Sequence, residues 1–91
     1  MQKLNELLQE LGISKVRLAK YLGVSRQMVY NYLELDDLSK WPKEKKLMLF
    51  RLLDINDESE ISKVKVTTDY LMNVESKLTK NSKNKEEVNH S

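Results

Sequence analysis

The apolar residues of this chain recur every three to four positions in short segments that end at glycine. In residues 2–11, four leucines have the i, i+3, i+4, i+7 spacing that lines one face of an α-helix. Residues 15–22 repeat this pattern with Leu18 and Leu22. The spacing predicts two short helices, each followed by a residue suited to a left-handed helix end, Gly12 and Gly23.

Serine and proline mark the starts of the later helices. Ser14 is placed to cap the second helix, and Ser25 to cap a third helix over about residues 26–34. The stretch "ELDDLS" is typical of a loop. Pro42, the only proline, suits the first turn of a fourth helix that runs to about Leu53.

The fourth predicted helix is apolar almost all round. Leu47, Phe50 and Leu53 cover one side of "KLMLFRLL". Such a helix is rarely left half in water. It is either the central core helix, or its second side packs against a partner subunit or the C-terminal segment. That second side consists of Met48, Leu49 and Leu52.

The chain beyond residue 55 is patterned more weakly. "DINDESE" is polar and acidic, which is typical of a linker, and "KVKVTT" alternates β-branched residues in a way that favours a strand. Residues 61–78 nevertheless keep a helical pattern, and we predict a helix at least from about Asp69 to Leu78. The rest has almost nothing to bury and should be disordered. The expected organisation is a domain over 1–55, a linker and C-terminal helix over 56–78, and a disordered tail over 79–91.

The length and the pattern together predict a small all-α fold of four to five short helices with a polar C-terminal extension, since 91 residues suffice for one small core. The formal net charge of +2 is unevenly distributed. Residues 1–53 hold ten basic and six acidic residues, whereas residues 54–91 hold six lysines and eight acids. This asymmetry is expected if only the first part meets a polyanion.

The sequence offers little for catalysis. It has no cysteine, and its one histidine, His90, lies in the predicted tail. There is also no glycine-rich phosphate loop, serine elbow or cluster of metal-ligand residues. We therefore expect neither an enzyme nor a cofactor or metal. No segment is apolar for long enough to span a membrane, so we expect a cytoplasmic protein without a membrane partner.

The second and third predicted helices have the spacing of a helix-turn-helix. Ala19 is small enough for a close, steep helix crossing, and Gly23 permits the turn. The stretch "ISKVRLAKYLGVSRQMVYNYLE" resembles the helix-turn-helix of the phage-repressor and Cro-like (XRE-type) family of bacterial and phage regulators. "WPKEKKLMLFRLLDI" resembles the helix that comes after it in that family. The resemblance covers about residues 3–55 and implies a lambda-repressor-like fold and a repressor-like transcriptional regulator.

The resemblance implies that the third helix enters the major groove of double-stranded DNA while the second helix crosses the backbone. Gln27 and Asn31 are four residues apart and should share the exposed face. Either amide can pair with adenine, and Arg26 can pair with guanine or hold a phosphate. Tyr30 is expected to touch a thymine methyl or the backbone.

Several basic residues flank the predicted recognition helix. We expect them, together with Ser25 at the helix start, to contact phosphates. The principal candidates are Lys15, Arg17, Lys20, Ser25, Lys40 and Lys43, and Lys45 and Lys46 lie close by.

The residues after the third helix depart from the family pattern. Glu34 matches the family motif, but Asp36 and Asp37 after it would repel a phosphate, so this loop either points away from DNA or serves another partner. The role of Glu34 in the groove is open for the same reason. The alternative function is accordingly a protein–protein interaction module, or an antitoxin-like adaptor, that keeps the helix-turn-helix fold.

Useful affinity for DNA usually requires two copies. We therefore expect a homodimer. The candidate dimer interface, here called the dimer seam, consists of Met48, Leu49, Leu52 and residues 61–78. The chain is equally compatible with being the DNA-binding end of a longer protein.

Overall fold

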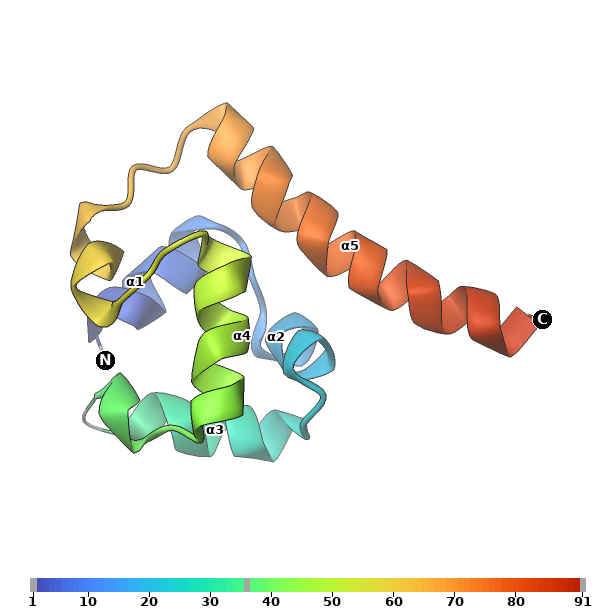
Figure 1. Ribbon diagram of the computed structural model, residues 1–91, viewed down its shortest axis with the longest axis horizontal. Coiled ribbons are helices and arrows are strands. Elements are labelled where there is room, and N and C mark those ends of the chain that lie inside the picture. Colours follow the sequence, from blue (N-terminus) through green and yellow to red (C-terminus); the bar gives the residue numbers. More distant parts are fainter. Residues whose placement is uncertain (1, 36, 91) are drawn as a thin grey trace.

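The computed structural model describes residues 2–35 and 37–90, with residues 80–90 as backbone alone. Every regular element in these ranges is helical, which confirms the predicted all-α fold (Figure 1). The elements are α1 (Gln2–Glu10), α2 (Lys15–Leu22), α3 (Arg26–Glu34), η1 (Leu38–Lys40), α4 (Lys43–Leu53), η2 (Glu58–Lys63) and α5 (Thr68–His90), where η denotes a short 3₁₀ helix.

Local capping explains where α2 and α3 begin and end. The Ser14 hydroxyl accepts a hydrogen bond of 3.2 Å from the Arg17 backbone N–H, and Ser25 accepts one of 3.1 Å from that of Met28. Gly23 ends α2 with a φ of +73°, a conformation that favours glycine. The predicted starts of both helices and the glycine end of α2 are confirmed.

Helix α4 lies in the core. Leu49, Leu52 and Leu53 are completely buried, so the interpretation of α4 as a core helix is confirmed, and α4 also packs against α5, as the alternative of packing against the C-terminal segment expected. Met48 is half-buried. Leu49 and Leu52 were also predicted for a dimer seam, and that prediction is wrong because side chains with no exposed surface cannot meet a second copy. Leu47 is the exposed apolar residue of α4, with 44% of its surface accessible.

The acidic segment after α4 is structured rather than a plain linker. Asp57 caps η2 and forms a capping box with Glu60, whose carboxylate accepts the backbone N–H of Asn56 at 2.7 Å. Ile61 on η2 is buried, and η2 packs against α1. Residues 56–63 therefore extend the core instead of separating it from α5.

The C-terminal segment is a helix, as predicted, and "KVKVTT" forms no strand. Val74 and Leu78 on α5 belong to the same core as α2 and α4. Ile61 is buried as well, so these three residues cannot contribute to the predicted dimer seam over residues 61–78, whereas Met72 on α5 is 64% exposed. The backbone of α5 continues to His90 through the stretch expected to be disordered, which contains no glycine or proline to end it.

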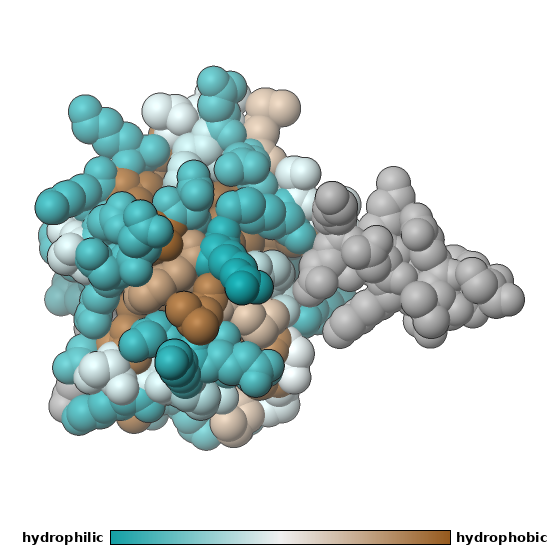
Figure 2. Space-filling view, in the orientation of Figure 1, coloured by the Kyte–Doolittle hydropathy of each residue, from teal (hydrophilic) through white to brown (hydrophobic). Residues whose placement is uncertain are grey.

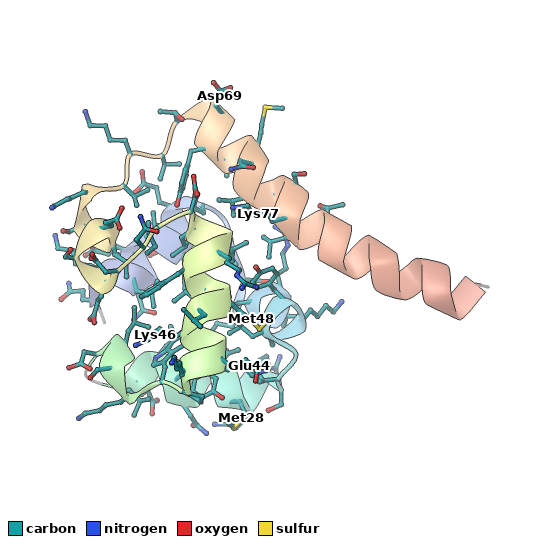
Figure 3. All side chains as sticks on the ribbon, in the orientation of Figure 1. Met28, Glu44, Lys46, Met48, Asp69 and Lys77 are labelled. Atoms are coloured by element: carbon teal, nitrogen blue, oxygen red, sulfur yellow. The ribbon has the colours of Figure 1, made fainter. Side chains whose placement is uncertain are left out.

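Two side chains of α5 hold the end of α4. The Tyr70 hydroxyl donates to the Leu53 carbonyl at 2.5 Å, and Lys77 Nζ donates to the Arg51 carbonyl at 2.6 Å. The last carbonyls of a helix lack their usual partner four residues later. Tyr70 supplies a partner for the Leu53 carbonyl, and Lys77 adds a second donor to the Arg51 carbonyl, which also accepts the Asp54 backbone N–H at 3.3 Å. Figure 3 shows Lys77 on α5 near this end of α4.

Trp41 joins the connection between α3 and α4 to the core. Its indole N–H donates to the Tyr32 carbonyl at 3.0 Å, and the two rings lie 5.0 Å apart. Only 4% of the Trp41 surface is exposed, so it is a core residue. Among the helices described, none has the length and apolar character required to cross a membrane.

Candidate nucleic-acid interface

The third helix presents two different faces. Val29, Tyr32 and Leu33 are buried against the bundle. The predicted base-contacting side chains all lie on the exposed part of the helix: Arg26, Gln27, Tyr30 and Asn31. Figure 3 places Met28, which is 39% exposed, at the outer edge of α3. The structure thus separates the residues that hold α3 from those left for a partner.

Gln27 and Asn31 are joined on this exposed face. Gln27 Nε2 donates a hydrogen bond of 3.2 Å to Asn31 Oδ1. The contact follows directly from their spacing, because residues four apart lie one above the other on a helix. The two amides that were expected to read bases separately therefore form a pair.

Lys15 and Tyr30 bring the start of α2 to the middle of α3. The Lys15 ammonium lies over the Tyr30 ring, 5.4 Å from its centre. This distance is within the range of a cation–π attraction. Both residues, with Glu34, line a groove of about 430 Å³ between α1, α2 and α3. Lys15 remains exposed, so its charge still faces solvent beside α3.

The other lysine candidates differ in their surroundings. Lys20 and Lys43 are exposed, as predicted for phosphate contacts. Lys40 is also exposed, but it takes part in interactions within the chain and lies near the Asp37 carboxylate. Lys45 donates to the Leu22 carbonyl at 2.8 Å and so caps the end of α2. Lys45 is therefore a structural residue.

Arg17, which was predicted to contact a phosphate, is paired within the chain. Its guanidinium donates hydrogen bonds of 2.8 and 2.7 Å to the two carboxylate oxygens of Glu75 on α5. The hydrogen bond from Arg17 is the main cause that lowers the pKa of Glu75, and the same bond raises the pKa of Arg17. Because Glu75 neutralises Arg17 within the chain, Arg17 is a poor candidate for a phosphate contact.

The acidic loop after α3 is stabilised by hydrogen bonds within the loop itself, which gives Asp37 a structural role. Asp37 caps η1 by accepting the Ser39 backbone N–H at 2.9 Å, and it also accepts the Ser39 hydroxyl. The hydrogen bond from the Ser39 hydroxyl is the first cause that lowers the pKa of Asp37. The Asp37 carboxylate thus stays charged and holds its own loop. Asp36 lies outside the described residues.

Two contacts around this interface could not be predicted from the sequence. The Arg17–Glu75 pair joins residues 58 positions apart, and Lys45 reaches a carbonyl 23 positions away, so no local pattern could reveal either. The Lys15–Tyr30 contact also joins two helices, although both residues are candidates individually. In the part of the chain that is described, no three acidic or histidine side chains gather in a way that could hold a metal ion.

Comparison of the chain with models of protein families, with curated proteins and with solved structures found no match. The function is therefore inferred from the geometry of α2 and α3 and from the helix-turn-helix resemblance of the sequence.

Proposed function

We propose that this chain binds double-stranded DNA sequence-specifically, as a repressor-like transcriptional regulator of the helix-turn-helix type, with α3 in the major groove. The observation that carries this proposal is the division of α3 into two faces. Val29, Tyr32 and Leu33 hold the helix, while the opposite face is polar and exposed. Within the described residues, the only hydrogen bond made by the side chains of that face joins Gln27 to Asn31.

The shape and chemistry of α3 suit the major groove. An α-helix with its side chains is about 10–12 Å across, and the major groove is about 12 Å wide. Arg26 offers paired donors that match guanine, and the amides of Gln27 and Asn31 offer donors and acceptors that match adenine. These three side chains lie in the first two turns of the helix, which is the part of a recognition helix that meets the base edges.

Exposed lysines around α3 supply contacts to the DNA backbone. Lys15 lies beside Tyr30, while Lys20 on α2 and Lys43 at the start of α4 are exposed. Each contact to a phosphate releases counterions, and this release supplies most of the sequence-independent affinity for DNA. The lysines thus support binding to the backbone, while the amides and Arg26 support sequence preference.

Two copies on adjacent half-sites would provide the base contacts that one short helix lacks. The interface of this proposed dimer excludes Leu49 and Leu52, which are buried in the core. Figure 2 shows that the face bearing α4 is largely hydrophilic, with hydrophobic residues gathered near its centre. The exposed Leu47 and the half-buried Met48, which was predicted for the dimer seam, remain accessible to a second copy.

The test is a titration of the chain with a fluorescent random-sequence duplex at two salt concentrations. DNA binding through three or four lysines predicts an affinity that falls roughly tenfold or more between about 50 and 200 mM salt. Absence of salt-sensitive binding to any duplex would reject the proposal. The exposed face of α3 would then be assigned to a protein partner, which is the alternative function.

A further inference from the structure

We infer that Asn31 positions the amide of Gln27, so that the two residues act together as a reader of adenine. This inference rests on the proposed function and adds the role of Asn31 as the residue that positions Gln27. It starts from the 3.2 Å hydrogen bond between Gln27 Nε2 and Asn31 Oδ1 on the exposed face of α3. Both side chains are exposed, and in the described chain this bond is the only one that either amide makes.

The hydrogen bond determines what the Gln27 amide has left to offer. An amide nitrogen carries two hydrogens and the amide oxygen accepts. Donation of one hydrogen to Asn31 leaves Gln27 with one N–H donor and its Oε1 acceptor. Adenine presents the complementary set in the major groove, with N7 as an acceptor and the N6 amino group as a donor. Gln27 can therefore pair with adenine through two hydrogen bonds while it keeps its bond to Asn31.

The same bond disfavours guanine. Guanine presents two acceptors, N7 and O6, in the major groove. A Gln27 amide that is bonded to Asn31 has only one donor left and would face one of these acceptors with its own oxygen. An amide without this bond could rotate and offer both hydrogens. Asn31 thus contributes to discrimination between adenine and guanine, while its own N–H donors remain for a neighbouring base or phosphate.

Pre-formation of the pair also lowers the cost of binding. A long exposed side chain loses conformational freedom when an interface immobilises it. The bond to Asn31 already restricts Gln27 in the free protein. Asn31 is accordingly a positioning residue for Gln27, in addition to any contact of its own.

The experiment begins with selection of a preferred duplex from a random library by the full chain. Each adenine of that duplex is then replaced by 7-deazaadenine, which keeps Watson–Crick pairing but removes the N7 acceptor. We expect one adenine in each half-site at which this replacement weakens binding roughly tenfold or more. In the Gln27→Ala variant, the same replacement should have almost no effect.

The role of Asn31 is tested by the ratio of the two affinities, for adenine and for 7-deazaadenine at that site. Asn31→Ala should reduce the ratio to below about threefold, because Gln27 is no longer held. Asn31→Asp keeps the oxygen that accepts from Gln27 and should restore the ratio. The added negative charge weakens binding to both duplexes, which carry the same phosphates, and so cancels from the ratio.

Gln2 provides a matched control. Its side chain also donates to a residue four positions later, Glu6, at 3.4 Å, on α1. Gln2→Ala should leave the ratio unchanged. A full ratio in Asn31→Ala, or a ratio in Asn31→Asp as low as in Asn31→Ala, would overturn the inference. Sequence-specific binding that depends on no adenine N7 would also overturn the inference, but it would leave the proposed function intact. The proposed function itself is rejected only by the absence of salt-sensitive DNA binding.

Discussion

The guanidinium of Arg17 on α2 donates two hydrogen bonds, of 2.8 and 2.7 Å, to the carboxylate of Glu75 on α5. This pairing connects the helix that supports α3 to the helix that completes the core. Two parallel hydrogen bonds make it more specific than an ordinary surface ion pair. Its energy is nevertheless moderated by solvent, because the two side chains are 38% and 39% exposed.

Glu75→Gln should lower the free energy of unfolding by about 0.5–1 kcal/mol near neutral pH. The pKa of Glu75 is lowered from its ordinary value of 4.5, chiefly by the hydrogen bond from Arg17. The stabilisation is therefore fully present above about pH 4.5 and is lost as the pH falls through the lowered folded value. Urea unfolding of both proteins across this range measures it. A difference between the proteins that persists unchanged into strong acid would show that the carboxylate charge is not its source.

Trp41→Phe should destabilise the fold by about 1–3 kcal/mol, since it removes a buried hydrogen bond to the Tyr32 carbonyl while it keeps an aromatic ring. The measurement is urea unfolding followed by circular dichroism, because the variant lacks the only tryptophan. Trp41→Leu is a useful companion, because it removes the ring contact with Tyr32 as well and should cost more. Equal stability of Trp41→Phe and the parent protein would contradict the assigned hydrogen bond.

Leu49→Ala and Leu47→Ala compare two leucines of the same helix. Leu49 has no exposed surface, so its truncation should cost about 2–5 kcal/mol, whereas truncation of Leu47, which is 44% exposed, should cost less than about 1 kcal/mol. Unfolding of the two variants in denaturant gives both values. If both substitutions lower the free energy of unfolding by similarly small amounts, Leu49 is not buried in the core and is again a candidate for a dimer contact.

The sequence predicts the parts of this fold that depend on neighbouring residues. Ser14, Ser25 and Gly23 mark helix ends because each acts on a backbone only a few positions away. The contact between Gln27 and Asn31 could be expected for the same reason. The positions of α1 to α4 follow from such local signals and from the spacing of leucines.

The features that the sequence did not reveal depend on contacts between distant segments. Nothing near Arg17 indicates that Glu75 will neutralise it, and nothing near Leu49 distinguishes burial in its own core from burial against a second copy. The structured region around η2 is a different case. Asp57 and Glu60 have the spacing of a capping box, so this signal was present, but the acidic composition favoured a linker.

In the proposed complex, Gln27 contacts a base and Lys20 contacts the DNA backbone. The affinities of two variants for two duplexes test this assignment most directly. Gln27→Ala should lose about 1–3 kcal/mol on the preferred duplex and almost nothing on random DNA. Lys20→Ala should weaken both duplexes alike and reduce the salt slope by about one. Titration at several salt concentrations measures both affinities, and this difference between the two variants is the result that the proposed function predicts. Equal behaviour of the two variants on both duplexes would contradict the assignment of α3 as the base-reading helix.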